Sequence, residues 1–410
     1  MTRARRPISL SVFLIGLSAS TVSRANVLGL FPAGVSCKSA AMESALDCSE
    51  PQTLFYNPAV MTSIQNGFAA ELGAAQLAYS YEHPDFDPVQ VDLYTPMFSE
   101  GWKGSLLEDH AAWGFAVMPG SMAELDIKGL PRRVSGTAES LKVNASRKMF
   151  HVPVGGSYLL PQYNLSLGAA VIYTYDKRTL KGAGISDPTT TLVDLKALGH
   201  FFRPVIGATW RALDTDFGSG YMFPLTKHYK GKTKLASEAD SFKTELVDYD
   251  PGVAMVSVRR EIADVTLSAN VNRLFAAKGQ TIPRDGVNRK TAKADLKDTN
   301  HYGIRAAYQS NGYGEFSLGL AYLDSFWGAG YYYKDADGFA HHELGHLFGT
   351  FNAVPVRNQA VTWRQSFASW QTHFGIFRSA GTTTVASGGD NPGYYQIEFV
   401  SLTCGIRRII

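Results

Sequence analysis

Apolar and polar residues alternate along short segments of this chain, so each segment has two chemically different sides. Between positions 164 and 176, one side carries Leu165, Leu167, Ala169, Val171, Tyr173 and Tyr175. The other side carries Asn164, Ser166, Gly168, Thr174 and Asp176. The same period of two returns at 264–272 and at 315–323. This period is typical of β-strands with one apolar face, and a long series of them predicts a transmembrane β-barrel.

Turns and polar loops divide the chain into these strands. Tight turns are predicted at 107–110, 161–163, 213–215, 261–263, 311–312 and 355–358. Longer loops are predicted at 83–87, 121–138, 179–195, 231–242, 276–297, 335–338 and 381–393. They connect fourteen strands, from about 67–81 to about 394–408, of which the second contains Pro88 and Pro96. Bacterial barrels have an even number of strands and short turns on the periplasmic rim. We therefore expect residues 67–410 to form an all-β, 14-stranded antiparallel transmembrane β-barrel.

The first 25 residues have the features of a secretory signal peptide. Arg3, Arg5 and Arg6 precede a short apolar stretch at 8–17, and a small-x-small cleavage site stands at 23–25. Removing these arginines and Arg24 changes the formal charge from +3 to −1, which argues against a nucleic-acid-binding protein. The chain holds 20 Tyr and 23 Phe, but only 18% of its residues are charged, as expected of an outer-membrane barrel with aromatic girdles. A secreted all-β protein is the alternative.

Residues 26–66 do not fit the strand pattern. Fourteen strands enclose a lumen too wide for their own side chains to fill, so we expect this Ala- and Ser-rich segment to form a hatch, or plug, inside the barrel. Cys37 and Cys48 could form a disulfide in an oxidising periplasm, or remain two unpaired thiols in the plug. Cys404, in the last strand, is expected to behave as a small apolar residue.

Three features of the chain resemble the FadL-type family of outer-membrane transporters for long-chain fatty acids and other hydrophobic compounds. Asn57-Pro58-Ala59 precedes the first strand, as in the hatch of that family. The segment 113–120 (WGFAVMPG) lies in the third strand, where the family has a kinked strand with glycine. The segments 152–158 and 165–169 resemble the next hairpin. The resemblance covers about residues 26–330.

The resemblance implies a passive transporter that takes hydrophobic ligands into an apolar interior and releases them sideways into the membrane. Met118, Pro119 and Gly120 are then the candidate kink and lateral gate, because Pro119 lacks an N–H and Gly120 tolerates unusual dihedral angles. An ordinary rim bulge is the alternative reading of these residues. We expect no enzymatic activity, no cofactor and a monomer. A general outer-membrane pore, or a structural surface protein with the same barrel, is the alternative function.

The segment His342-Glu343-Leu344-Gly345-His346 fits the H-E-x-x-H zinc motif. A secreted zinc metalloprotease using His342, Glu343 and His346 is therefore a remote alternative. The extended motif would place its third ligand at Asn352, a poor zinc ligand, and no methionine follows Met255 to form a Met-turn. Read as a strand, the segment would hold its two histidines roughly 13 Å apart, so we expect no metal site here.

A basic cluster of Lys227, Lys230, Lys232 and Lys234 lies at the outer loop predicted over 231–242. It could attract a carboxylate ligand or the phosphates of lipopolysaccharide, or it could be an ordinary solvated loop. The partners expected overall are hydrophobic small molecules such as fatty acids, outer-membrane lipid and lipopolysaccharide.

The last predicted strand changes its apolar side part-way. Tyr395, Ile397 and Phe399 share one face, whereas the apolar residues from Val400 to Ile406 take the other parity. The chain also ends in Ile410 and not in an aromatic residue. This pattern leaves the register of the last strand open.

Overall fold

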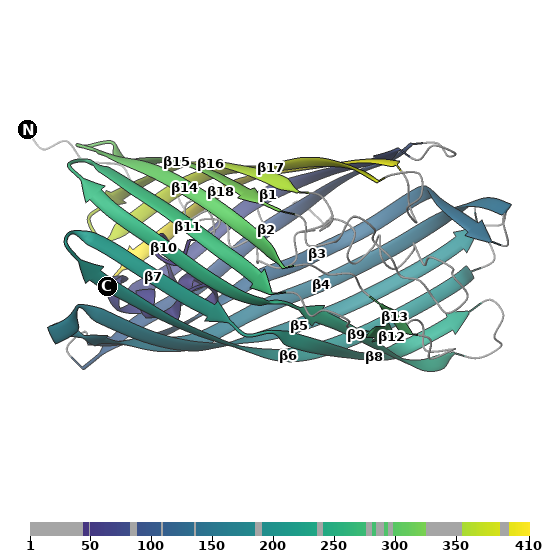
Figure 1. Cartoon of the computed structure of the whole chain (residues 1–410), viewed down its shortest axis with the longest axis horizontal. Helices are drawn as coiled ribbons and strands as arrows, with labels where there is room; N and C mark the ends of the chain where they lie inside the picture. The colour runs from purple at the N-terminus through teal and green to yellow at the C-terminus, as the bar shows by residue number, and fades with distance from the viewer. Residues whose placement is uncertain are drawn as a thin grey trace, which may run out of the picture.

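The computed structural model describes residues 44–48, 50–82, 88–107, 110–134, 137–184, 191–235, 241–275, 281–283, 291–293, 298–324, 355–385 and 393–410. Their strands form one antiparallel sheet that closes on itself through the pairing of β5 with β6. Figure 1 shows the resulting barrel, with the C-terminus at one end. Among the described residues, no helix is long and apolar enough to span a membrane.

The strands of the barrel wall are β1 (Gly67–Glu82), β2 (Val89–Leu106), β3 (Ala111–Val134), β4 (Thr137–Leu160), β5 (Leu165–Gly184), β6 (Thr191–Ala212), β7 (Thr215–Met222), β8 (Leu225–Leu235), β9 (Phe242–Asp250), β10 (Gly252–Ile262), β11 (Val265–Phe275), β14 (Thr299–Ser310), β15 (Gly314–Leu323), β16 (Val356–Phe367), β17 (Trp370–Val385) and β18 (Gly393–Ile409). A separate two-stranded ribbon joins β12 (Thr281–Pro283) to β13 (Thr291–Lys293). Three short 3-10 helices are η3 (Pro51–Phe55), η4 (Pro58–Ser63) and η5 (Pro161–Tyr163).

Two of the wall strands are each interrupted once. Strand β6 pairs with both β7 and β8, and these two segments pair in turn with β10 and β9. Thus β7 and β8 are halves of one strand, as are β9 and β10, and the barrel has fourteen strands. Pro224 and Pro251 stand at the two interruptions, where each removes a backbone donor from the ladder. The predicted 14-stranded antiparallel barrel is confirmed.

The alternation found in the sequence sets the two faces of the wall. On β5, Leu167 and Val171 are exposed on the outside, whereas Ser166, Thr174 and Asp176 are buried. On β18, the buried residues are odd-numbered and the more exposed ones even-numbered, from Tyr394 to Arg408. Strand β18 pairs with β1 from Tyr394 to Ile409 without interruption, which gives the register that the sequence left open. The apolar side chains of β18 thus lie on two faces of the wall: Tyr395, Ile397 and Phe399 face the interior, and Leu402 faces outward.

Four predicted boundaries, of one tight turn and three loops, are wrong. The sixth tight turn lies between β16 and β17, at Ala368 and Ser369, and not at 355–358, where β16 begins. Ala368 adopts a left-handed φ of 50°, which alanine seldom does, so no residue type marked this turn. The polar stretches predicted as loops at 121–138, 179–195 and 231–242 are largely strand. Polar residues on both faces do not prevent strand pairing, and β3, β4, β5, β6, β8 and β9 continue into these stretches. The loop predicted at 335–338 lies outside the described residues.

Pro96 is accommodated in β2 because that part of the strand is an edge. It stands opposite Ala74 of β1, but β2 pairs with β3 only from Glu100 to Leu106. Proline is tolerated in strands that are unpaired on one side.

Candidate functional site

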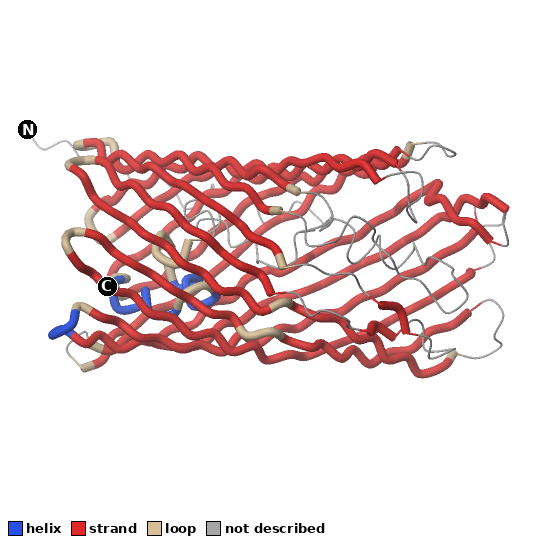
Figure 2. The backbone as a smooth tube through the Cα atoms, in the orientation of Figure 1, coloured by secondary structure: helices blue, strands red, loops and turns tan. Residues whose placement is uncertain are grey.

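The segment before β1 packs against the inner wall of the barrel at the end where the C-terminus lies (Figure 2). Asn57 begins η4, and its side-chain oxygen accepts a hydrogen bond of 3.1 Å from the Ala59 amide. Its side-chain nitrogen donates to the carbonyls of Ala45, at 2.8 Å, and of Ala208 on β6, at 3.2 Å. Asn57 and Ala59 are fully buried. The motif 57–59 therefore joins the segment to the wall.

Two glycines of the wall allow this close approach. A Cβ atom at Gly207 on β6 would collide with the side-chain oxygen of Asn57. A Cβ atom at Gly168 on β5 would collide with the backbone of Ala59. At both positions, only glycine leaves room for the segment before β1 to approach the wall so closely.

Buried charges link the same segment to strands on the opposite side of the wall. The carboxylate of Asp47 lies 3.6 Å from the Arg305 guanidinium of β14. His373 of β17 stands between two carboxylates, with Nδ1 3.4 Å from Glu50 and Nε2 2.5 Å from Glu71. Ligand atoms of these last three residues lie within 4.8 Å of one another, close enough to share a metal ion. Each ring nitrogen of His373 already faces one carboxylate, so the group also serves as an ionic bridge without a metal.

The cysteines have different states in the structure. Cys48, in the segment before β1, is disulfide-bonded. Cys404 on β18 is a free, exposed cysteine. Cys37 lies outside the described residues.

The hydrogen-bonded wall is interrupted between β2 and β3. The ladder between them runs from Leu106 opposite Ala111 to Glu100 opposite Val117, and it ends there, although both strands continue. Met118, Pro119 and Gly120 follow directly, and the register of β3 with β4 shifts between Pro119 and Ser121. The missing N–H of Pro119 and the bulge at Gly120 both disfavour continued pairing with β2.

Apolar side chains cover the inner wall on both sides of this interruption. All of them are almost fully buried, and they come from β1, β2, β3, β4, β17 and β18: Leu77, Met97, Met118, Met149, Phe377 and Phe399. Phe399 stands opposite Leu77 in the ladder, and its ring centroid lies 6.1 Å from that of Phe377. Methionine adapts its shape to irregular apolar ligands, and three of these six side chains are methionines. We call these six residues the inner apolar wall.

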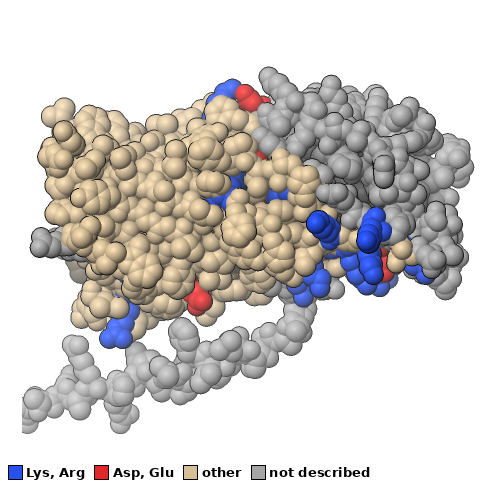
Figure 3. Space-filling model, turned by 90° about the horizontal axis from the view of Figure 1, so that it is seen from below, with Lys and Arg blue, Asp and Glu red and all other residues tan. Residues whose placement is uncertain are grey.

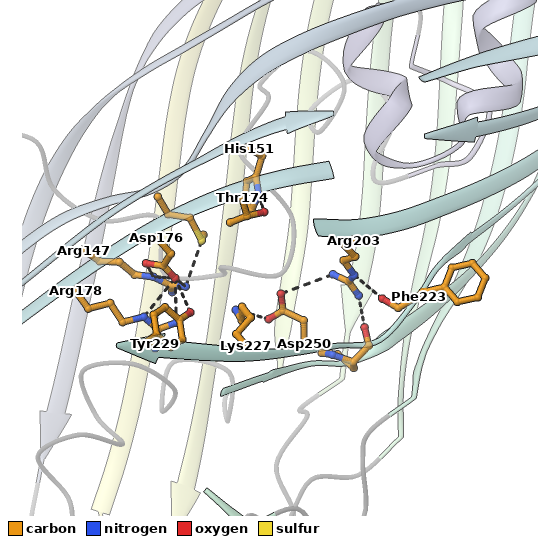
Figure 4. Close-up of polar contacts among 12 residues, drawn as sticks. Arg147, His151, Thr174, Asp176, Arg178, Arg203, Phe223, Lys227, Tyr229 and Asp250 are labelled. Carbon is orange, nitrogen blue, oxygen red and sulfur yellow. Dashed lines mark hydrogen bonds and ion pairs between the residues drawn. The ribbon is translucent and has the colours of Figure 1, made fainter. Parts of the chain in front are cut away.

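A polar cluster around Asp176, shown in Figure 4, adjoins the inner apolar wall, because Met149 stands opposite Asp176 in the ladder. The buried carboxylate of Asp176 accepts hydrogen bonds from Arg147 at 2.7 Å, from Arg178 at 3.1 Å and from the Tyr229 hydroxyl at 2.8 Å. The Arg178 guanidinium also lies 4.2 Å from the centre of the Tyr229 ring. Charge-assisted hydrogen bonds of this kind are the strong ones, so the cluster is well ordered.

A second ionic group lies beside the two strand interruptions, between β7 and β8 and between β9 and β10. Lys227 Nζ is 2.6 Å from the Asp250 carboxylate, and Arg203 Nη1 is 3.9 Å from it. Arg203 also donates to the carbonyls of Phe223, at 2.6 Å, and of Pro251, where the broken ladder leaves them without strand partners. Together, the two groups hold four cations (Arg147, Arg178, Arg203 and Lys227) and two carboxylates, which gives these six side chains a formal charge of +2. Asp248 stands opposite Lys227 in the ladder.

The structure separates the four lysines that the sequence grouped. Lys227 is buried and faces inward, whereas Lys230, Lys232 and Lys234 are exposed on the outside of β8. They lie on a strand and not on a loop, so the predicted anion-attracting loop is wrong as a single group. His342, Glu343 and His346 lie outside the described residues. The Asp176 cluster was not predicted, although Asp176 and Thr174 shared the polar side of their segment.

Solved structures provide the comparison. The toluene transporter TodX of P. putida is 11% identical, with a TM-score of 0.59, and the match covers 89% of this chain and 97% of TodX. The toluene transporter TbuX of Ralstonia pickettii is 12% identical, with a TM-score of 0.57 and coverages of 94% and 100%. The monoaromatic hydrocarbon channel CymD is 14% identical, with a TM-score of 0.57 and coverages of 94% and 98%. The chain shares its fold with these channels.

This fold is the one that the FadL-type resemblance predicted. No protein-family model matches the chain, and no curated protein matches its sequence. Because the identities are low, the matches establish the architecture, and the function has to be argued from the residues.

Proposed function

We propose that this protein is a FadL-type passive transporter of the outer membrane that takes up hydrophobic compounds. Ligands enter the barrel from the loop side, follow the inner apolar wall and leave sideways between β2 and β3. Residues 26–66 act as the hatch that closes the axial route. The observation that carries the proposal is the ladder that ends at Val117, directly beside Met118 of the inner apolar wall.

The energetics favour a sideways route. Each methylene transferred from water to an apolar environment gains roughly 0.8 kcal/mol, so a long alkyl chain is held strongly by an apolar wall. An axial route would pass the hatch, whose described residues are mostly buried and tied to the wall by Asn57, Asp47 and Glu50. Where β2 and β3 are not paired, a ligand passes between them without breaking ladder hydrogen bonds, and it arrives directly in lipid.

The polar cluster indicates the chemistry of the ligand. Arg147 Nη2 lies 3.3 Å from Met149 Sδ, so a cation adjoins the inner apolar wall. An apolar chain that ends in a carboxylate suits this arrangement, which supports long-chain fatty acids as the ligand class. The similar channels carry toluene and monoaromatic hydrocarbons by their names, which supports aromatic compounds as a second class.

Restoring the wall between β2 and β3 tests the route. Replacing Pro119 by Val and deleting Gly120 supplies an N–H and removes the bulge. Uptake of radiolabelled oleate and toluene is measured in a host strain that lacks its own channels for them. We expect the wild-type protein to restore uptake and this variant to reduce it at least tenfold. The control is Pro204→Val. Pro204 is an exposed proline on β6, it pairs with Val171, and it lies far from the place where the ladder between β2 and β3 ends.

Folding is checked by heat-modifiable migration on a gel, so a loss of uptake is not confused with a loss of barrel. Uptake at the wild-type rate in a folded Pro119/Gly120 variant would reject the sideways route. Absence of uptake with the wild-type protein would reject the transport function. A large, steady ion current through the purified wild-type protein in a planar bilayer would favour the general pore instead.

A further inference from the structure

The exposed lysines of this barrel are gathered on one part of its outer surface. Figure 3 shows Lys and Arg side chains concentrated toward one end of the wall, with only scattered charges over the rest of that face. Among the residues whose side chains the structure describes, every exposed lysine lies on β4, β5, β6, β8 or β9: Lys142, Lys148, Lys177, Lys181, Lys196, Lys230, Lys232, Lys234 and Lys243. We call these nine residues the lysine belt.

The register brings lysines of the belt directly opposite one another. Lys148 stands opposite Lys177, and Lys232 stands opposite both Lys196 and Lys243, which gives a row of three across three strands. Side chains directly opposite in a ladder have Cβ atoms about 5 Å apart, and like charges at this distance repel. Such a row is unfavourable for the barrel alone and becomes favourable when an anion lies across it.

The acidic residues facing the belt are few. In the ladder, Asp194 stands opposite Lys181 and Lys234, and Glu245 stands opposite Lys230. No acidic residue stands directly opposite Lys148, Lys196 or Lys232. Nor do the lysines of the belt form ion pairs with any described side chain. On β3, Glu124 and Asp126 stand opposite Ser146 and Asn144, on the face of the wall that carries Lys142 and Lys148. Across β6, β8 and β9, the five lysines of the belt stand against the two carboxylates of Asp194 and Glu245.

The belt lies just beyond an aromatic girdle. Along the outer face of β5, the residues read Leu167, Ala169, Val171, Tyr173, Tyr175 and then Lys177. Phe150 stands beside Tyr175 in the ladder, and Phe202 packs on Tyr173 with ring centroids 5.4 Å apart. Aromatic girdles mark the boundary between hydrocarbon and headgroups. Along a strand, one outward-facing residue is separated from the next by roughly 6.6 Å. Lys148 and Lys177, which follow the girdle directly, thus stand at headgroup level, and Lys142 and Lys181 stand further out along the same strands.

We propose that the lysine belt is a binding surface for the phosphate groups of lipopolysaccharide in the outer leaflet. The belt lies at the end of the strands remote from the short turns, which is the outer side of a barrel with a periplasmic short-turn rim. A lipid with several phosphates on one sugar headgroup can bridge the in-register lysines, whereas a single phosphodiester reaches fewer of them. This surface is separate from the lumen, so the proposal does not depend on what the channel transports.

The test compares two triple variants of the full-length, refolded protein. Lys196→Gln, Lys232→Gln and Lys243→Gln together remove the in-register row. The control, Arg211→Gln, Arg260→Gln and Arg408→Gln, removes three exposed cations near the short turns. Binding of lipopolysaccharide in detergent is measured by native mass spectrometry and by titration. We expect at least tenfold weaker binding for the lysine variant, since each basic residue near an anionic membrane surface contributes to the attraction, and wild-type binding for the control.

Three further arms identify the ligand chemistry. Dephosphorylated lipopolysaccharide and phosphatidylglycerol should each bind at least tenfold more weakly than intact lipopolysaccharide, and raising the salt concentration should weaken the intact complex. Equal binding of the wild type and the lysine variant would overturn the proposal. Equal binding of intact and dephosphorylated lipopolysaccharide, or of phosphatidylglycerol, would overturn it as well. Heat-modifiable migration confirms that both variants are folded.

Discussion

Substitution of Asp176 by Asn removes the charge at the centre of the polar cluster while keeping the size of the side chain. The carboxylate is fully buried and joined to Arg147, Arg178 and Tyr229 at 2.7, 3.1 and 2.8 Å. Without it, two buried guanidinium groups lose their anion. Removing one partner of a buried ion pair costs about 3–5 kcal/mol, so we expect the free energy of unfolding to fall by about this amount.

The assay is urea unfolding of the refolded barrel in lipid vesicles, followed by tryptophan fluorescence. The control is Asp298→Asn, whose carboxylate pairs with Arg273 at 3.0 Å on the surface, with side chains 30% and 47% exposed. Exposed pairs contribute about 0–1 kcal/mol, so this variant should unfold almost like the wild type. If Asp176→Asn costs less than about 1 kcal/mol, the cluster is not the buried ionic network described above.

The same substitution also tests the ligand chemistry. It raises the formal charge of the inner cationic groups from the +2 given by their ion pairs to +3. Oleate binding, measured by titration in detergent, should therefore strengthen, while toluene binding should stay unchanged because toluene carries no charge. Weaker oleate binding in a folded Asp176→Asn protein would contradict a role for these cations in holding a carboxylate.

Three smaller predictions concern the segment before β1. Asn57→Ala removes three buried hydrogen bonds, so we expect a loss of about 2–4 kcal/mol and faster proteolysis of this segment, whereas equal protease resistance would contradict its role as an anchor. Gly207→Val places a side chain where Asn57 lies and should increase the ion current in planar bilayers; an unchanged current would show that the contact is dispensable. His373→Leu leaves the Glu50 and Glu71 carboxylates without their shared bridge and should lower the urea midpoint, in contrast to the exposed His228→Leu, which should not.

The sequence was sufficient to predict the number and the pairing direction of the strands. The period of two is strong in segments such as 164–176 because one face of each strand meets lipid, and β5 carries that pattern as predicted. The same reasoning failed toward the ends of the strands remote from the short turns, where β3, β4, β5, β6, β8 and β9 continue through polar residues.

The candidate site was predictable only in part. The local break in β3 at Met118, Pro119 and Gly120 could be read from the sequence, because proline and glycine act locally on the backbone, whereas its role as a gate stays a proposal. The Asp176 cluster needed the register of three strands, since Arg147 lies 29 positions before Asp176 and Tyr229 lies 53 positions after it. The lysine belt needed the same knowledge, because Lys196, Lys232 and Lys243 become neighbours only through pairing. Lys227 differs in parity from Lys230, Lys232 and Lys234 on the same strand, so the period of two could have separated it from them.

Photocrosslinking of the ligand path tests the central claim most directly. A long-chain fatty acid with a diazirine on its chain is taken up by cells expressing the protein, irradiated, and mapped by mass spectrometry. We predict adducts on Met97 and Met118 of the inner apolar wall, and on Tyr94 and Phe115, which are exposed on the outside of β2 and β3. Adducts confined to the hatch around Asn57 and to the short-turn rim would mean that ligands follow the barrel axis, and would contradict exit between β2 and β3.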